Sequence, residues 1–599
     1  MSHFPVFAGQ PQPRVQEGPL SAPTSNDGDA PTPEDESSSP ARPAGSAAGS
    51  VAAGILASRV LGLVREKAVA YFFGVGPFLD VFQLALRGAN LLNNLLGEGT
   101  LSASFIPVYS RLLEEGRERD AGRFAGAILG LLIAVAVVIT GIGMVFAEPF
   151  VRYVLAPGFA GDAALVAQGT ETVDRLPLAV RALRFALPMA ACLALSAWAL
   201  GVLKSHRRFF LPYVAPTLLN IAVITGLVVG SMTIFGDPFG GPDGILTADI
   251  DSLERLLMAA MVGALVGGVL QFTVQLPAVF RVLKGFRLSL SRRVEGVTEA
   301  LQAFGPVLAG RGVAQVSSYV DTVLAGFAAQ GTLGALRPAL VLYMLPISLF
   351  GMSVAASELP ELSRLGAEER AKFLDRVSDS TKQVLYLVVP TVVGYLLFGW
   401  FIVSALFGGG SFDGDDVWLV FLTLAGYTVG LGATATSRLL QNSFYALNEA
   451  SVPARIAVLR VVISGVIGAG LMFTLDARTV GEWVDLEVPS RLSLAAVGLA
   501  AGASVGAWVE LTALVWSLRS RLPGFGLPIG TIARMVLVAV GSAVPVAALL
   551  AWVPFFGTTV GSIGAIGLYA SSYLGIGIAL SFPEGRVWTD RFVRRIWRR

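Results

Sequence analysis

The sequence has little charge for its length. Of its 599 residues only 14% are Asp, Glu, Lys or Arg, whereas 54% are hydrophobic. A soluble globular domain carries about 25% charged residues, so this composition excludes a row of soluble domains. Apolar runs of about 18 or more residues recur along the chain, which is typical of a polytopic helical membrane protein. A β-barrel would show shorter alternating segments.

Residues that build metal, disulfide and catalytic sites are also scarce. The single Cys192 excludes a disulfide framework and a CxxC site. The two histidines, His3 and His206, are too few and too far apart for a zinc site. The sequence has no GxxxxGK[ST], GxSxG or HExxH motif. We therefore expect a membrane transporter and no enzyme, no cofactor, no metal and no nucleic-acid partner.

The chain divides into a polar tail, fourteen expected spans and a basic end. Residues 1–48 are rich in Pro, Ser, Gly and acidic residues, which predicts a disordered tail. Residues 583–599 form a basic tail. Between them we expect an all-α protein with about 14 transmembrane helices. The expected spans are 50–73, 78–106, 124–147, 183–203, 211–235, 255–279, 299–329, 333–357, 382–407, 416–445, 454–475, 491–516, 530–553 and 558–582.

Charge in the loops alternates along the chain. Most Lys and Arg fall in one set of loops, such as 111–123, 281–293 and 364–382, whereas loops of the other set, such as 237–251, are acidic. The positive-inside rule then places both termini on the cytoplasmic side of the membrane.

An internal repeat relates the two halves. The run at Ser104 (SFIPVYSRL) matches the run at Ser357 (SELPELSRL) at five of nine positions, and shorter matches recur at nearly the same offset. Six expected spans separate the copies, which predicts two six-helix bundles related by an axis along the membrane normal, a transporter architecture. We expect bundles at 49–280 and 281–516 and two additional helices at 517–582.

Charged residues inside the expected spans are candidates for function, because each is costly in the bilayer. The first span contains Arg59 and Arg65, separated by about 240° net around the helix. The second and seventh spans are also polar, and Arg337 begins the eighth. Arginines clustered in a low-dielectric cavity need anions, and guanidinium groups bind phosphate bidentately, which predicts an anionic phosphate or pyrophosphate substrate. The candidate substrate-binding residues are Arg59, Arg65, Arg87, Asn93, Asn94, Arg311 and Arg337, and the candidate charge-pairing or gating residues are Asp80, Glu98 and Asp321.

Several ordered motifs resemble those of the MurJ/MviN family over roughly residues 50–582. They are Ser58-Arg59-Val-Leu-Gly62-Leu-Val-Arg65-Glu66, Phe73-Gly74, Asp80-Val-Phe82, Asn90-Leu-Leu, Gly97-Glu98-Gly99, Pro107-Val-Tyr109, Gly312-Val-Ala-Gln315, Val320-Asp321-Thr, Leu345-Pro346, Leu359-Pro360, Ser443-Phe-Tyr-Ala-Leu447 and Val452-Pro453. The resemblance implies a flippase for lipid II, the undecaprenyl-pyrophosphate-linked peptidoglycan precursor, within the multidrug/oligosaccharidyl-lipid/polysaccharide exporter superfamily. It also implies two bundles that alternate access and two further helices that form a lipid-tail groove.

The same resemblance assigns residues. Arg59, Arg65, Asp80 and Glu98 match family positions in the cavity or the signature, and Arg87 matches a basic position. The chain departs from the family at Asn93, Asn94 and Val341, where members commonly have arginines, and at Ser464 and Gly468, where some members have a sodium-binding Asn/Asp pair. Arg337 or Arg311 would compensate for the missing arginines.

Our hypothesis from the sequence is an alternating-access flippase for lipid II, in which the arginines hold the pyrophosphate and Asp80 and Asp321 pair with those arginines and switch partners. Expected partners are lipid II, membrane lipids and cell-wall synthesis proteins. Three alternatives stay open: a flippase for another lipid-linked oligosaccharide, a cation-coupled small-molecule exporter of the same superfamily, and a non-transporting cell-wall scaffold.

Overall fold

A computed structural model describes residues 44–241, 245–365, 369–483, 492–552, 559–580 and 582. The chain divides into Met1–Ser46 and Ala47–Arg599, and the second unit is described here. All regular elements of the described ranges are helices, with two isolated β-bridges, Gly409↔Phe412 and Thr479↔Ser493. The prediction of an all-α fold is confirmed. Residues 1–43 of the predicted tail and 583–599 lie outside the described residues, and α1 begins at Ala44, inside the predicted tail.

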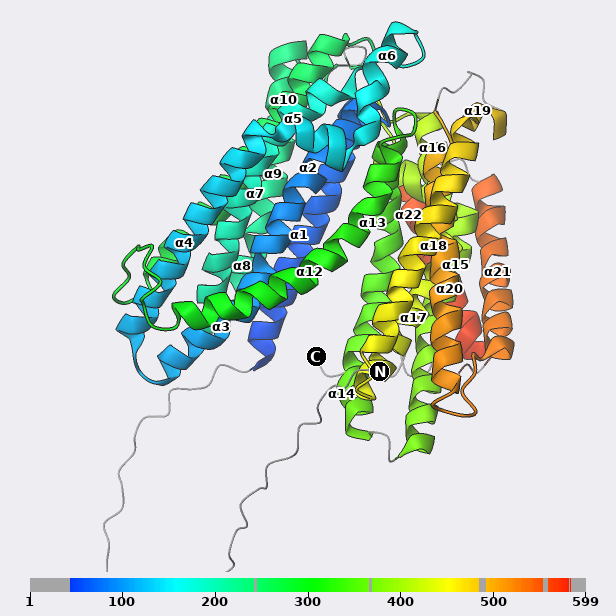
Figure 1. Cartoon of the computed structure of the whole chain (residues 1–599). Helices are drawn as coiled ribbons and strands as arrows, with labels where there is room; N and C mark the ends of the chain where they lie inside the picture. The colour runs from blue at the N-terminus through cyan, green and yellow to red at the C-terminus, as the bar shows by residue number, and fades with distance from the viewer. Residues whose placement is uncertain are drawn as a thin grey trace, which may run out of the picture. The chain divides into compact units, whose positions relative to one another are not determined.

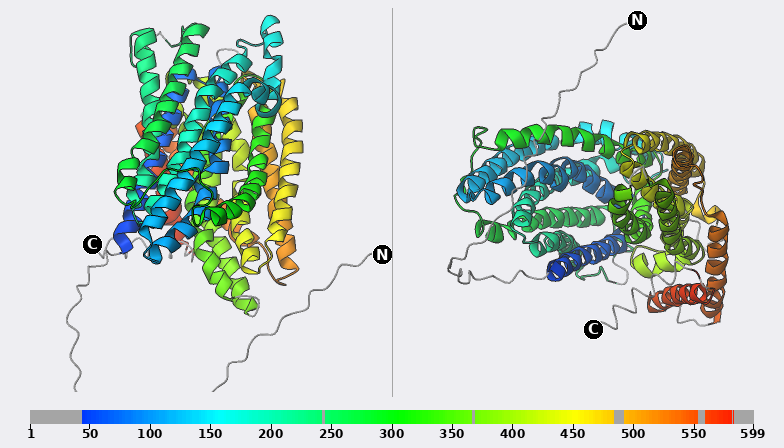
Figure 2. Two further views of the ribbon diagram at one scale, coloured as in Figure 1. Left: turned by 60° about the vertical axis from the view of Figure 1, so that its left-hand side comes forward. Right: turned by 90° about the horizontal axis from the view of Figure 1, so that it is seen from below.

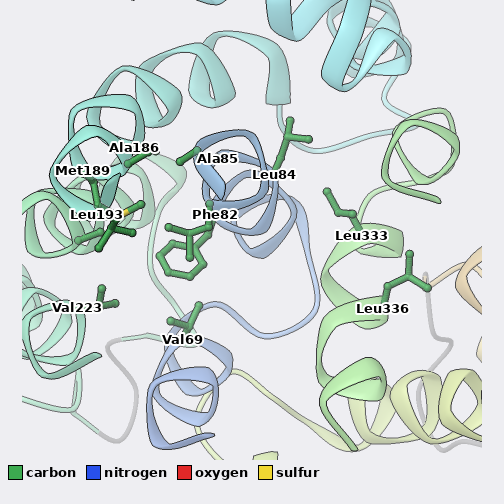
Figure 3. Close-up of a cluster of buried hydrophobic side chains, with 14 of the residues drawn as sticks. Val69, Phe82, Leu84, Ala85, Ala186, Met189, Leu193, Val223, Leu333 and Leu336 are labelled. Atoms are coloured by element: carbon green, nitrogen blue, oxygen red, sulfur yellow. The ribbon is translucent and has the colours of Figure 1, made fainter. Parts of the chain in front are cut away.

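The first bundle comprises α1 to α11. Its helices are α1 (Ala44–Phe73), α2 (Pro77–Leu96), α3 (Glu98–Glu114), α4 (Glu118–Val145), α5 (Ala147–Phe150), η1 (Val151–Leu155), η2 (Pro157–Gly161), α6 (Asp162–Ala167), α7 (Arg175–Ser205), α8 (Phe210–Val214), α9 (Pro216–Phe235), α10 (Ile250–Thr273) and α11 (Leu276–Phe280). Helix α7 packs against α2, α3, α4 and α10, so it is the central helix of this bundle. Its apolar side chains meet those of α2 in the core, where Phe82 and Ala85 lie opposite Ala186 and Met189 (Figure 3).

The second bundle comprises α12 to α20, and two further helices follow it. Their bounds are α12 (Val297–Ala325), α13 (Thr332–Pro346), η3 (Ile347–Gly351), α14 (Met352–Leu365), α15 (Arg370–Phe407), α16 (Gly414–Thr428), α17 (Leu431–Ala446), α18 (Ser451–Asp476), α19 (Val480–Trp483), α20 (Ala495–Arg519), α21 (Ile529–Trp552) and α22 (Thr559–Ala579). Seen from below, helices of the first bundle lie together on one side and those of the second bundle on the other (Figure 2). We call the side that carries the α1–α2 turn, residues 74–76, the outer side, and the opposite side the inner side.

Every expected span coincides with a helix or a helix pair. Within the described ranges, nine helices are long and apolar enough to cross a membrane, or eleven if two bent pairs each form one span. The total of fourteen therefore stays a prediction. The expected span 78–106 is broken at Gly97 into α2 and α3, and 416–445 is bent by 41° between α16 and α17. The helical hairpin from Ala147 to Ala167, which is bent by 109°, was not predicted from the sequence.

Helix α12 connects the two bundles. It contacts α2, α3 and α4 of the first bundle and also α13, α18 and α20 of the second, so it runs obliquely between them (Figure 1). The linker before it is tied to the first bundle, because Arg117 donates two hydrogen bonds to the carboxylate of Glu295. These bonds hold the pKa of Glu295 below its ordinary value. The sequence boundary at residue 281 therefore precedes a helix that belongs structurally to both halves.

Two prolines inside helices leave carbonyl groups that tyrosines satisfy. A proline has no N–H, so the carbonyl four residues earlier loses its helical donor. Before Pro346 that carbonyl belongs to Leu342, and it accepts the hydroxyl of Tyr395 at 2.9 Å. Before Pro390 it belongs to Tyr386, and it accepts the hydroxyl of Tyr573 at 3.0 Å. The second bond ties α22 to α15, so the additional helices dock on the second bundle through polar as well as apolar contacts.

Helices α18 and α20 approach through a seam of glycines, which gives a test of the packing. A Cβ added at Gly502 of α20 would lie 2.3 Å from the Cα of Gly468 on α18, whereas a Cβ at Gly470 of α18 would meet open space. We expect Gly502→Ala to separate the helices and lower the melting temperature of the purified protein. Gly470→Ala is the matched control, and we expect it to be neutral or slightly stabilising because alanine favours helix. Equal melting temperatures for the two variants would contradict this account.

Candidate functional site

The centre of the protein contains a carboxylate shared by three donors. Glu66 on α1 is buried and accepts hydrogen bonds from Arg65 and, at 3.0 Å, from Gln83 on α2. Arg337 of α13 reaches the same carboxylate at 3.4 Å from the second bundle. Burying a carboxylate costs several kcal/mol unless it is paired, so Glu66 needs these cations. Glu66 therefore joins an arginine from each bundle.

The two arginines of the first span point to different partners, as their angular separation predicts. Arg65 is half-buried and donates to Asn220 of α9 at 3.1 Å within the first bundle. Arg59 is exposed and donates to the hydroxyl of Ser348 in η3 at 3.2 Å. Arg59 thus reaches the second bundle from the inner half of α1, whereas Arg65 is held beside Glu66.

A second polar contact joins α2 to α12. Arg87 donates to the hydroxyl of Thr322, and the hydroxyl of Tyr319 donates back to the carbonyl of Arg87. Asp321, next along α12, is reached electrostatically by Arg87 from one bundle and by Arg460 from the other. Arg87 and Asp321 therefore lie within electrostatic reach of each other, and their direct pairing stays a prediction.

Charges of the second bundle extend this network. Arg460 on α18 pairs at 2.6 Å with Glu510 on α20, and Glu510 also accepts from Gln441 on α17 at 2.7 Å. Glu510 is almost fully buried, so its two donors satisfy a charge that would otherwise be unpaired. The charged line from Arg87 through Asp321 to Glu510 thus crosses from the first bundle to the second.

The central cluster, defined as Arg59, Arg65, Arg87, Arg337, Glu66 and Asp321, carries more positive than negative charge. Four arginines against two carboxylates leave a net charge of +2. Each carboxylate neutralises part of this charge, and water screens more of it because Arg59 is exposed and Arg337 is partly exposed. The residual charge matches an anion with two negative charges, and guanidinium forks suit phosphate oxygens.

The structure corrects the predicted partner of Asp80. From the sequence we expected Asp80 to pair with the central arginines, but its ion-pair partner is Arg175 of α7, at 2.9 Å. The reason is its position in the first turn of α2, at the outer side and two turns from Arg87. Asp80 also accepts the backbone N–H groups of Gly331 and Gly334 at 2.8 and 2.6 Å. It therefore caps the N-terminus of α13, where carboxylates are favoured.

Arg175 organises this outer site, and it was not predicted from the sequence. Its side chain is buried, pairs with Asp162 of the helical hairpin at 2.6 Å and lies 4.2 Å over the ring of Phe159. It also donates to the carbonyl of Ala328 in the second bundle at 3.3 Å. The only sequence signal was an arginine at the start of an apolar helix, which does not distinguish a buried residue from a loop residue. Glu66 was missed as well, although its place beside Arg65 in the motif could have indicated it.

The other four predicted site residues lie on α2, α3 and α12. Asn93 and Asn94 lie in the last turns of α2, and the carbonyl of Asn93 accepts the N–H of Gly97 at 2.7 Å where the helix breaks. The side chains of Glu98 and Arg311 lie outside the described residues, although their backbones are in α3 and α12. Among the described residues, no group of His, Cys, Asp or Glu could hold a metal ion.

Comparison with known proteins places this geometry in context. A family model described as "Lipid II flippase MurJ" matches residues 69–571, a range that begins just after Arg65 and Glu66. A probable lipid II flippase MurJ of Rhizobium tropici is 31% identical over 425 residues, which cover 71% of this chain and 74% of the relative. A lipid II flippase MurJ of Burkholderia cenocepacia is 27% identical over 502 residues, covering 83% of this chain and 87% of the relative.

Solved structures are similar in fold. A structure described as lipid II flippase MurJ in an inward closed conformation has a TM-score of 0.63 at 20% identity, covering 88% of this chain and 99% of that one. An inward-facing multidrug resistance MATE family transporter of the MOP superfamily has a TM-score of 0.52 at 15% identity, covering 80% and 100%. The expected fold, an all-α polytopic membrane protein, is thus confirmed.

Proposed function

The chain belongs to the family of the lipid II flippase MurJ, and from this premise we propose that it moves lipid II across the bacterial inner membrane by alternating access. The observation that carries the proposal is the family match over residues 69–571, which includes both bundles. The chain is accordingly a multi-pass membrane transporter and not an enzyme. Its direct substrate is a lipid-linked molecule, which it meets among the lipids of the membrane.

In this proposal the central cluster holds the pyrophosphate. Its net charge of +2 offsets an ionised pyrophosphate, which cannot cross the hydrocarbon unpaired because a bare charge there is prohibitively costly. Arg87 and Arg337 come from different bundles and Arg65 lies beside Arg337 through Glu66. Substrate oxygens would take over the donors of Arg65 and Arg337 that Glu66 now occupies, which exchanges one set of charge-assisted bonds for another.

The outer site acts as a gate in the same scheme. Asp80 accepts the N–H groups of Gly331 and Gly334, and Arg175 donates to the carbonyl of Ala328, so these bonds cross between the bundles on the outer side. Opening this side breaks them together, so the gate favours access from the inner side until substrate binds. Helices α21 and α22 would guide the undecaprenyl chain, since they pack outside the second bundle on α15.

We further propose that both termini are cytoplasmic, that 49–280 and 281–516 move as the two bundles, and that cell-wall synthesis proteins are partners. The loop charges support the orientation. A reporter that is active only in the cytoplasm, fused to either terminus, tests this orientation directly.

Complementation tests the substrate. In a bacterium depleted of its own flippase, we expect the chain to restore growth and to restore the exposure of lipid II on the outer face of the membrane. Restored growth without exposure of lipid II would indicate the scaffold alternative. Transport of another lipid-linked oligosaccharide in place of lipid II would indicate a different substrate for the same transporter.

A further inference from the structure

A loop of the second bundle completes the end of α1. The loop 408–413, between α15 and α16, places the N–H of Ser411 at 2.8 Å from the carbonyl of Tyr71 and the Ser411 hydroxyl at 3.3 Å from the carbonyl of Phe72. The last four carbonyls of a helix have no intrahelical donor. The second bundle therefore supplies the C-terminal cap of the first helix of the first bundle.

The carboxylate of Asp416 binds the backbone of the α1–α2 turn, which follows α1. Asp416 lies in the first turn of α16, is 4% exposed, and accepts the N–H of Val75 at 2.7 Å. Among the described residues no Lys or Arg pairs with it, in contrast to Asp80 with its partner Arg175. The N-cap residue Asp413 fixes the geometry, because its side chain accepts the N–H groups of Asp415 and Asp416.

The α1–α2 turn is shaped to receive this loop. Gly74 has φ +57, in the left-handed region that favours glycine. A Cβ there would lie 2.5 Å from the carbonyl oxygen of Ser411 and 2.8 Å from Oδ2 of Asp416. Both the conformation and the close approach require glycine, so a side chain at position 74 would push the loop 408–413 away from the turn.

Each of the two outer carboxylates binds backbone groups of the opposite bundle. Asp80 of the first bundle caps α13 of the second, and Asp416 of the second bundle binds the turn before α2 of the first. Each bundle thus satisfies backbone groups of the other, and separation of the outer side leaves both sets to water. The contact between Asp416 and the α1–α2 turn favours the closed outer side, because separation would break the bond between the carboxylate of Asp416 and the N–H of Val75.

We propose that the loop 408–413 with Asp416 and the α1–α2 turn form a second outer latch, and that Asp416 is the positioning residue that sets the ratio of outer-closed to outer-open molecules. The proposal rests on the alternating-access part of the proposed function. It differs from the Asp80 gate in its elements, since it joins α1 and α16 where the Asp80 gate joins α2, α7 and α13.

Distance measurements between spin labels test the latch. In a Cys192→Ser background, one pair of labels at Ala163 and Ala477 reports the outer side, and a second pair at Glu114 and Ala371 reports the inner side; all four positions are exposed. For Asp416→Ala we expect a roughly tenfold rise in the open-to-closed ratio on the outer side, the effect of losing a bond to a charged group. The distance between the labels on the inner side should shorten at the same time.

Matched variants separate gating from general destabilisation. We expect Asp416→Asn to stay much closer to the unchanged protein than Asp416→Ala does, because the amide oxygen still accepts the N–H of Val75 and only the charge is lost. Asp415→Ala, a neighbour outside the contact, should also leave the distances unchanged. If Asp416→Ala does not fold, Gly74→Ala gives the second test, because its Cβ pushes the loop away and should produce the same shift.

The outcomes distinguish the two proposals. If Asp416→Ala leaves both distance distributions unchanged while Asp80→Ala shifts them, the latch is overturned and alternating access stands. The latch is likewise overturned if Asp416→Asn opens the outer side as fully as Asp416→Ala. If neither aspartate variant nor added lipid II shifts either distribution, the alternating-access proposal itself is overturned.

Discussion

The double variant Arg87→Ala, Arg337→Ala is expected to lose lipid II binding by roughly two to four orders of magnitude. Each guanidinium would contribute charge-assisted bonds to the pyrophosphate, worth about 1.5–3 kcal/mol apiece. Their removal also takes the net charge of the central cluster from +2 to zero. Binding to the purified protein, measured by native mass spectrometry against a series of lipid II concentrations, reports this loss directly.

The structure provides controls for that experiment. Glu66 keeps its bond from Arg65 and Asp321 keeps the nearby Arg460, so neither carboxylate is left alone by the double substitution. Arg123→Ala on the exposed start of α4 removes a positive charge far from the cluster and should leave binding unchanged. Arg87→Lys, Arg337→Lys should recover only part of the affinity, because lysine keeps the charge without the planar fork. Unchanged affinity in the alanine variant would show that pyrophosphate binds elsewhere.

Arg175→Met is expected to be the most destabilising single substitution at the outer site. It leaves the carboxylates of Asp80 and Asp162 buried side by side without a cation. Removing one member of a buried ion network costs about 3–5 kcal/mol, because the remaining charges are uncompensated. Thermal unfolding of the purified protein should show a clearly lower midpoint than the unchanged chain.

A second arginine on α7 is the control. Arg181 is exposed and pairs with Glu254, and an exposed pair is worth at most about 1 kcal/mol. Arg181→Ala should therefore leave the midpoint almost unchanged. The triple variant Arg175→Met, Asp80→Asn, Asp162→Asn should recover stability relative to Arg175→Met, because it removes the unpaired charges. No recovery would mean that packing on Phe159, rather than charge, makes Arg175 important.

The sequence predicted elements better than partners. Long apolar runs place a helix at every expected span, since burial in lipid imposes the same requirement on each. The break at Gly97 was not predicted, because apolar residues resume after Gly97-Glu98-Gly99 and isolated glycines inside a helical pattern are tolerated. The hairpin from Ala147 to Ala167 was missed because its pieces are each shorter than a span.

Which charged residues pair with each other depends on how the helices pack, and the residues around each position do not reveal that packing. Spacing on a single helix placed Asp80 near the face of Arg87, yet two turns of rise put it at the outer side beside Arg175. The pairing of Arg337 with Glu66 joins residues 271 positions apart and follows only from the packing of α13 on the first bundle, where α13 contacts α2. Charge inside a span therefore identified candidate residues, whereas their roles required the fold.

Exposure of lipid II in intact cells is the most direct test of the central claim, that this chain flips lipid II through its central arginines. Cells depleted of their own flippase would express either the unchanged chain or the Arg59→Ala, Arg65→Ala variant at equal levels in the membrane, and lipid II on the outer face would be labelled. The account predicts that the unchanged chain restores labelling and that the variant does not. Equal labelling by the two would contradict it.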